Sequence, residues 1–132
     1  MLQKYPMYAY IPARDVARAR KFYETKLGLK PGDQQIDGGV AYPFGDHTAA
    51  FLYEAGDSAG TSKASQAFWK VKDLESEVAQ LRARGVEFET YDPDEIGGLT
   101  MKDGIARGDG MKAAWFKDTE GNIMALIEEG GA

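Results

Sequence analysis

The amino-acid sequence predicts an α+β fold made of two βαβββ modules, which span about residues 5–56 and 64–129 of a single domain of 132 residues. Each half opens with a short segment rich in aromatic residues, and an amphipathic helix follows directly. Asp15 and Asp73 occupy the same N-cap position before the two helices. The last part of the chain reads as a strand, a tight turn and a second strand. The repeated order of these elements is the basis for the predicted architecture.

In the first module, residues 8–11 are expected to form a strand because aromatic and β-branched side chains dominate there. Pro12 is expected to end this strand, since proline donates no backbone hydrogen bond. Asp15 should cap a helix that runs to about residue 26, and Gly28 should end it. The apolar side of this helix is expected to consist of Val16, Ala19, Phe22, Tyr23 and Leu27.

The second module repeats this order. Asp73 is expected to cap a helix that Gly85 ends, and residues 86–91 should form an extended segment. Its apolar side should contain Leu74, Val78 and Leu81. Further strands of the two modules are expected at residues 40–44, 49–53, 67–71, 113–116 and 123–127.

Two connecting segments have informative compositions. Residues 118–122, Asp-Thr-Glu-Gly-Asn, combine an Asp that can bond the backbone with a Gly and an Asn that tolerate positive φ, which predicts the turn of a closing β-hairpin. Residues 92–112 form a long Gly-rich connector, and such a loop in a compact domain is more often functional than idle. The same segment could also contain a strand at residues 96–101, which are moderately apolar. Its acidic cluster of Asp92, Asp94 and Glu95 is more simply a solvated turn than a cation site.

Composition excludes several classes of function. The formal net charge of −5 argues against nucleic acid as a partner, because phosphate binding requires a Lys/Arg patch. The chain has no cysteine, so it has no disulfide, thiolate nucleophile or cysteine metal site. No apolar run reaches the roughly 18 residues of a membrane span, and the N-terminal residues lack the apolar region of a signal peptide. We therefore expect a cytoplasmic protein that does not bind membranes.

Three segments, in this order, resemble the vicinal oxygen chelate superfamily of glyoxalases, bleomycin-resistance proteins and extradiol dioxygenases. Residues 16–29 resemble the first helix of the family, with an aromatic pair followed by Leu-Gly, and residues 71–86 resemble its second helix. Residues 118–122 resemble its final hairpin, with Thr119 where proline is usual. The resemblance implies that the two modules form a curved mixed sheet around a cleft, within one chain or across a dimer. It also implies a homodimer.

The resemblance further implies four positions at which metal-using members carry ligands. In this sequence they fall at Tyr8, Phe51, Gln66 and Ala125, and moving the second position to Tyr53 or Glu54 does not repair the set. A phenol, a phenyl ring, an amide and a methyl group cannot assemble a site for a divalent metal, which requires imidazole, thiolate or carboxylate groups. We therefore expect no metal and no cofactor.

Strand alternation then predicts which side chains line the cleft. They are Tyr8, Tyr10, Phe51, Tyr53, Gln66, Phe68 and Ala125, with Ala49, Ile123 and Ile127 beside them. Trp115 could face either way and is included as a candidate, whereas Trp69 is expected to face the core. The connector of residues 92–112 could close over the cleft with apolar contacts from Met101, Ile105 and Met111. Such an aromatic, nearly uncharged wall suits a flat or apolar ligand, although the same rings could instead fill the core.

Three functions remain open. The first is a small-molecule-binding protein of the bleomycin-resistance type, which holds an aromatic or apolar ligand such as an antibiotic or other natural product. The second is a metal-independent lyase or isomerase, with an acid or base among Tyr8, Tyr10, Tyr42 and Tyr53 or a nearby carboxylate. The third is a regulatory domain with a vestigial cleft. His47, the only histidine, is expected to be a solvated turn residue.

Overall fold

The structure is a computed structural model that describes residues 1–32 and 38–130. Its contacts divide the chain into two compact units. The first unit contains Met1–Ser62 together with the turn Asp118–Asn122, and the second contains the rest of the described chain. The sequence analysis assigns that turn to the second module, so the units differ there from the expected modules. Each unit is an α+β arrangement of one α-helix and one mixed sheet, as predicted.

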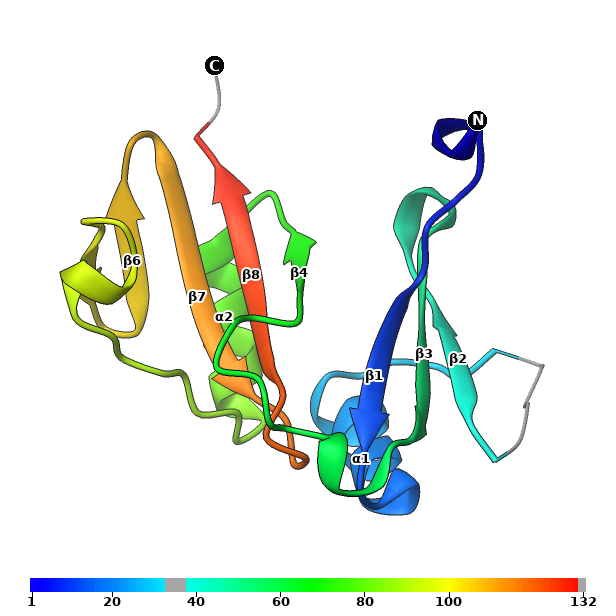
Figure 1. Cartoon of the computed structure of the whole chain (residues 1–132). Helices are drawn as coiled ribbons and strands as arrows, with labels where there is room; N and C mark the ends of the chain where they lie inside the picture. The colour runs from blue at the N-terminus through cyan, green and yellow to red at the C-terminus, as the bar shows by residue number, and fades with distance from the viewer. Residues whose placement is uncertain (33–37, 131–132) are drawn as a thin grey trace. The chain divides into compact units, whose positions relative to one another are not determined.

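The first unit is built on a three-stranded sheet in the order β1-β3-β2 (Figure 1). Its strands are β1 (Ala9–Ala13), β2 (Val40–Pro43) and β3 (Ala49–Glu54). Strand β3 pairs in parallel with β1 and antiparallel with β2. Helix α1 (Val16–Lys21) follows β1, and the side chain of Asp15 caps it by accepting a hydrogen bond from the backbone amide of Arg18 at 3.0 Å.

The core of the first unit lies between this sheet and the helical segment. Ile11, Leu52 and Tyr42 are fully buried on one face of the sheet, and Ala19 and Tyr23 are fully buried on the helical side. Alternation along a strand sends the neighbouring side chains to the opposite face. The same pattern that buries Ile11 and Leu52 therefore leaves the other face of β1 and β3 open for aromatic side chains.

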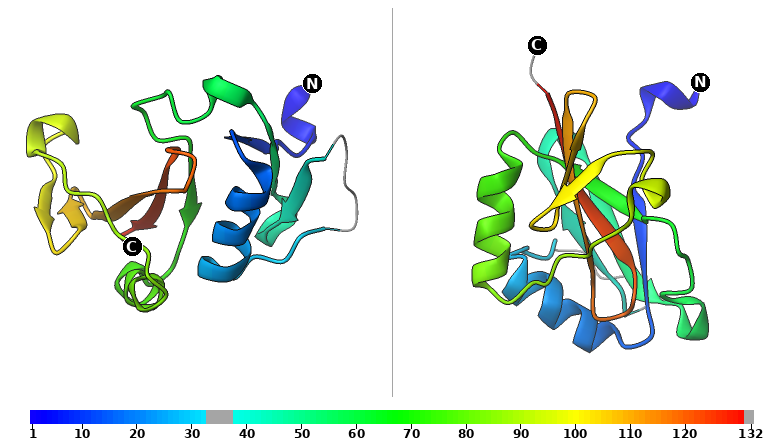
Figure 2. Two further views of the ribbon diagram at one scale, coloured as in Figure 1. Left: turned by 90° about the horizontal axis from the view of Figure 1, so that it is seen from below. Right: turned by 90° about the vertical axis from the view of Figure 1, so that its left-hand side faces the viewer.

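The second unit is built on a five-stranded sheet in the order β4-β8-β7-β6-β5. Its strands are β4 (Ala67–Lys70), β5 (Thr100–Lys102), β6 (Ile105–Gly108), β7 (Met111–Lys117) and β8 (Ile123–Glu129). Strand β4 is parallel to β8, and the other pairs are antiparallel. Helix α2 (Leu74–Ala83) lies against one face of the sheet (Figure 2). Leu74 and Val78 of this helix form a buried cluster with Ile105, Ala114 and Leu126.

Short helical turns complete the described chain. They are η1 (Leu2–Lys4), the π-helical η2 (Phe22–Lys26), η3 (Gly45–His47), η4 (Gly56–Ser58) and η5 (Pro93–Glu95). The helix expected after Asp15 is thus an α-helix of six residues continued by a π-helical turn. Gly28 and Gly85 follow the two helices with φ of 70° and 92°, as their expected role requires. None of the helices in residues 1–32 and 38–130 is long and apolar enough to cross a membrane.

Two expectations about local structure were wrong. Pro12 lies inside β1 and does not end it, which is possible because β1 is an edge strand that, among the described residues, pairs with β3 alone. Ile105 is 6% exposed in the core, so it is not a contact of a lid. The connector of residues 92–112 contains strands β5 and β6, and β5 overlaps the strand that residues 96–101 allowed. Residues 86–91 contain a single bridge, which joins Phe88 to Phe116.

Candidate functional site

Three aromatic rings gather on the open face of the first unit. Tyr10 of β1 contacts Tyr53 of β3 edge to face, with ring centroids 5.0 Å apart and an interplanar angle of 64°. The ring of Phe51 lies 6.1 Å from that of Tyr10 and is parallel to that of Tyr53 within 9° at 6.4 Å. Tyr10 is 62% exposed, and Tyr53 and Phe51 are half-buried. The sequence analysis placed these three side chains on one face, and the strand register brings them together.

Tyr8 precedes β1 and is 59% exposed, so it does not fill the core of its unit. Together with Tyr10, it places two phenol rings on the exposed surface of the chain near its N-terminal end. Exposure of large aromatic side chains favours a role in binding over a role in packing.

A second row of candidate residues crosses the sheet of the second unit. The strand register aligns Phe68 of β4 with Ala125 of β8, and Ala125 with Trp115 of β7. Phe68 is 58% exposed, whereas Ala125 is buried between its two larger neighbours. Gln66 lies just before β4, is exposed, and donates a backbone hydrogen bond to the carbonyl of Ile123 at 2.6 Å. The convergence of this row with the aromatic rings of the first unit stays a prediction.

Trp69 points to the opposite face of the same sheet, as the alternation predicts. Its ring stacks on that of Phe116 at 6.2 Å and 12°, and it packs against the buried cluster beneath α2. Trp69 is therefore a core residue, and Trp115 is the tryptophan of this unit on the open face.

Trp115 also borders a pocket of about 330 Å³ in the second unit. Tyr91 lines the same pocket and meets Trp115 edge to face, with ring centroids 5.5 Å apart and an interplanar angle of 76°. The hydroxyl of Tyr91 is buried, and no residue of the described chain forms a hydrogen bond with it. Tyr91 was not among the site residues predicted from the sequence. Its position in an aromatic-containing segment directly after a helix was the available signal.

Tyr42 was a candidate acid or base, but the structure places it in the core. It is fully buried on the face of the sheet opposite to Tyr10, and its hydroxyl donates to Glu24 at 2.9 Å. Burial, together with the Glu24 carboxylate, raises the pKa of Tyr42 well above its ordinary value. Tyr42 therefore remains protonated and bonded within its unit, which makes it unsuitable as a catalytic base.

The donor set at the four implied ligand positions does not fit a divalent metal ion. Tyr8 and Gln66 offer a phenol and a neutral amide, and Phe51 and Ala125 offer no donor atom. Within residues 1–32 and 38–130, no three or more His, Asp or Glu side chains group in a way that could hold a metal. His47 is exposed in the turn η3 with φ of 62°, as expected for a solvated turn residue.

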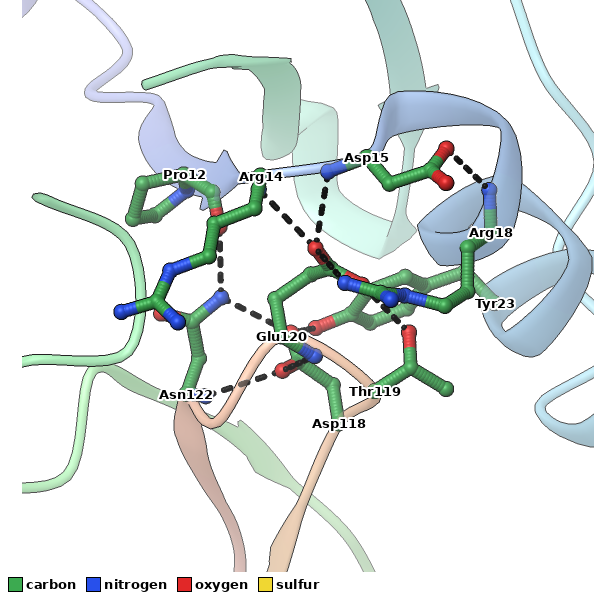
Figure 3. Close-up of polar contacts among 9 residues, drawn as sticks. All are labelled: Pro12, Arg14, Asp15, Arg18, Tyr23, Asp118, Thr119, Glu120 and Asn122. Atoms are coloured by element: carbon green, nitrogen blue, oxygen red, sulfur yellow. Dashed lines mark hydrogen bonds and ion pairs between the residues drawn. The ribbon is translucent and has the colours of Figure 1, made fainter. Parts of the chain in front are cut away.

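The turn of residues 118–122 is a polar centre that the sequence analysis recognised only as a turn (Figure 3). Glu120 is 5% exposed, and its carboxylate accepts hydrogen bonds from the backbone amides of Arg14 at 2.9 Å and Asp15 at 3.0 Å. It also accepts from the Arg18 guanidinium and from the hydroxyl of Thr119 at 2.8 Å. Burial alone would raise the pKa of Glu120, but these donors outweigh it and lower the pKa to about 2.

Asp118 and Asn122 satisfy the rest of this turn. One oxygen of Asp118 accepts from the backbone amides of Glu120 and Asn122, both at 2.9 Å, and the other accepts from the Tyr23 hydroxyl at 2.5 Å. The amide of Asn122 donates to the carbonyl of Pro12 at 2.8 Å. The bonds of this network to Pro12, Arg14, Asp15 and Arg18 fix the turn against the start of α1.

Comparison with known protein families identifies the family of this chain. The chain belongs to the Glyoxalase/Bleomycin resistance protein/Dioxygenase superfamily, whose family model matches residues 6–126. No curated protein sequence matches the chain.

Solved structures of similar fold have low sequence identity to the chain, so they show the fold alone. TnmS3, an antibiotic binding protein from Streptomyces sp. CB03234, has 18% identity and a TM-score of 0.69, with 95% of each chain covered. A glyoxalase / bleomycin resistance protein from Catenulispora acidiphila has 20% identity and a TM-score of 0.68, with 93% of this chain and 96% of the other covered. Oxidase ChaP-H2 has 17% identity and a TM-score of 0.68, with 96% and 98% covered.

Proposed function

We propose that this protein binds a flat aromatic or largely apolar small molecule, without a metal ion, on aromatic sheet faces that its own core leaves open. The observation that carries the proposal is the cluster of Tyr10, Phe51 and Tyr53, whose rings contact one another on the face opposite to the buried core. An exposed cluster of large rings gains hydrophobic stabilisation when a ligand covers it.

The chemistry of this cluster favours stacking with a few polar contacts. Phenyl and phenol rings offer broad apolar surfaces, and the hydroxyl groups of Tyr10 and Tyr53 can orient a polar substituent of the ligand. Phe68 and Trp115 of the second unit provide the same kind of surface. The proposed ligand class is an aromatic natural product such as an antibiotic, and the fold shared with the antibiotic binding protein TnmS3 supports that choice.

A metal-independent lyase or isomerase is the second candidate function. The observation that favours it is the pair of tyrosine hydroxyls, from Tyr10 and Tyr53, on the same aromatic cluster that would hold the substrate. The fold shared with Oxidase ChaP-H2 supports a catalytic role for this architecture.

The expected setting of this activity is a cytoplasmic homodimer that binds neither nucleic acid nor membranes. The net charge of −5 supports the absence of nucleic-acid binding.

A thermal-shift screen of aromatic natural products tests the proposal. We expect the full-length protein to be stabilised by at least one planar compound, and we expect the stabilisation to fall in Tyr10→Ala. A matched control is Lys21→Ala on the exposed surface of α1, which should leave the shift unchanged. A bound compound that is recovered chemically altered supports the enzymatic alternative. Absence of any saturable stabilisation contradicts ligand binding.

A further inference from the structure

The pocket beside Trp115 has charged and polar side chains in its lining, unlike the cluster of Tyr10, Phe51 and Tyr53 in the first unit. It is contained within the second unit and is lined by Trp115, Tyr91, Lys63, Ser65, Glu95 and Ile96. Its volume of about 330 Å³ lies in the range of small-molecule sites, roughly 300–1,000 Å³. Aromatic and aliphatic walls combine there with a small number of polar groups.

The hydroxyl of Tyr91 is the polar group from which we infer the kind of ligand. Its hydroxyl is buried and has no hydrogen-bond partner in residues 1–32 and 38–130. Buried hydroxyl groups are normally paired, because an unpaired one loses its bonds to water without replacement. Burial, followed by the nearby charges of Glu89 and Glu95, raises the pKa of Tyr91, so the hydroxyl keeps its proton near neutral pH. It is therefore a hydrogen-bond donor for which the described chain provides no acceptor.

The two aromatic rings supply the complementary surface. The edge-to-face contact of Tyr91 with Trp115 fixes both rings as a corner of the pocket. Lys63 adds a second donor, while Glu95 adds a negative charge of opposite sign. Because Lys63 and Glu95 carry opposite charges, the pocket disfavours a strongly charged ligand. It is compatible with a neutral ring system that carries an oxygen acceptor.

We propose that this pocket is a binding site for a planar aromatic molecule with a carbonyl oxygen, which accepts a hydrogen bond from Tyr91 while its ring packs against Trp115. This inference rests on the proposed function and narrows it in two ways. It assigns a site that one unit provides by itself, and it names the carbonyl oxygen as the group that is recognised.

The test uses the ¹⁵N-labelled full chain and coumarin, a two-ring probe with one carbonyl oxygen. The protein has two tryptophans, so its spectrum has two indole N–H signals, and Trp69→Phe assigns them. We expect coumarin to shift the Trp115 signal saturably and to leave the signal of Trp69, which is packed beneath α2, unchanged. Naphthalene, which has the same ring size and no oxygen, should bind more weakly.

Three variants locate the site. Tyr91→Phe should weaken coumarin binding about fivefold, the effect of one hydrogen bond, and should leave naphthalene binding unchanged. Ala64 also lines the pocket, so Ala64→Phe should fill it and abolish binding of both probes. Ala79→Phe makes the same change at an exposed position of α2 and should have no effect.

The outcomes separate this inference from the proposed function. If coumarin binding survives Ala64→Phe but is lost in Tyr10→Ala, the open face binds the ligand and the pocket inference is overturned. If Tyr91→Phe has no effect on coumarin affinity, the hydroxyl is satisfied by water and the carbonyl recognition is overturned. If coumarin fails to bind while other aromatic compounds stabilise the protein, the pocket inference fails and the proposed function stands. If neither the coumarin titration nor the thermal-shift screen detects binding, both the pocket inference and the proposed function are overturned.

Discussion

Arg18 forms a two-pronged ion pair with Glu120, a residue far along the chain. The guanidinium donates from Nε to one carboxylate oxygen of Glu120 at 2.8 Å and from Nη2 to the other at 3.0 Å. The Glu120 side chain is fully buried, while that of Arg18 remains half-exposed. The backbone amides of Arg14 and Asp15 also donate to Glu120, so its carboxylate bonds to three residues at the start of α1. This arrangement makes the fold sensitive to the protonation of one side chain.

We expect the protein to lose stability as the pH falls from about 4.5 towards 2. The pKa of Glu120 is lowered from 4.5 to about 2 in the folded state. A group whose pKa is lower in the folded state stabilises the fold above its unfolded pKa, and this contribution disappears as the folded pKa is approached. The contribution of Glu120 is up to about 3 kcal/mol. Urea unfolding at a series of pH values measures it.

Glu120→Gln is the matched variant for this measurement, since it keeps the shape and removes the titration. We expect it to be less stable than the parent at pH 7 and to show a flatter dependence between pH 4.5 and 2. Equal pH dependence in the two proteins would show that the loss of stability has its origin in other carboxylates.

Gly60 is predicted to tolerate no side chain. It has a φ of 71°, and a Cβ atom there would collide with the backbone carbonyl of Glu120. Gly56 has a φ of 55° and no atom within 4 Å of an added Cβ, so it is a matched control. We expect Gly56→Ala to cost about 1–2 kcal/mol from backbone strain alone. Gly60→Ala should cost about 1–3 kcal/mol more, from the displacement of the turn. Chemical denaturation measures the unfolding free energy of both variants. Equal losses of stability would contradict the predicted collision at Gly60.

The sequence predicted the elements whose signals are local. Asp15 and Asp73 cap their helices through bonds to an amide three residues ahead, so the cap and its partner lie within one stretch of sequence. The alternation that places Ile11 in the core and Tyr10 on the open face is equally local. Strand β6 was not predicted, and β5 only overlaps the end of the strand allowed at residues 96–101. Each is three or four residues long, and Gly and Asp residues at their ends gave a stronger turn signal.

The site was only partly predictable because its contacts are distant in sequence. Alternation brought Tyr10 together with Phe51 and Tyr53, but no local pattern pairs Tyr91 with Trp115. The role of Glu120 as a hydrogen-bond acceptor at the start of α1 also depends on where folding places the turn. Long-range polar contacts of this kind leave no periodicity in a single sequence.

We predict that purified protein carries far less than one divalent metal ion per chain. Tyr8, Phe51, Gln66 and Ala125 provide no carboxylate or imidazole at the implied ligand positions. Elemental analysis of protein prepared without chelator measures the content, and added Zn²⁺ or Ni²⁺ should leave the melting temperature unchanged. One tightly held ion per chain, lost on substitution near these positions, would refute the prediction.

We predict a homodimer in solution. The N-terminal segment exposes apolar side chains, with Met7 89% and Leu2 83% exposed, and such surfaces are usually covered in an assembly. Sedimentation at micromolar concentration should give a species of twice the 14.5 kDa chain mass. Met7→Asp should weaken the dimer, whereas Lys4→Asp, which changes a polar residue of the same segment, should weaken it less. A single species of one chain mass in the parent would contradict the prediction.

The final prediction separates stability from binding at the exposed rings. Tyr10 is 62% exposed and Phe68 is 58% exposed, whereas Phe116 is fully buried in the core of the second unit. Phe116→Ala should therefore cost about 3–5 kcal/mol of unfolding free energy, as buried aromatic truncations do. Tyr10→Ala and Phe68→Ala should each cost about 1 kcal/mol or less, because most of each ring is already in water.

Ligand affinity should show the opposite order. Removal of a stacking ring should weaken the binding of an aromatic compound found in the thermal-shift screen about tenfold, since its burial is completed only by the ligand. Unfolding midpoints and titration calorimetry on the same three variants measure the two effects side by side. If Tyr10→Ala and Phe68→Ala unfold like Phe116→Ala and bind the compound as well as the parent does, these rings are structural and the aromatic faces are not the binding surface.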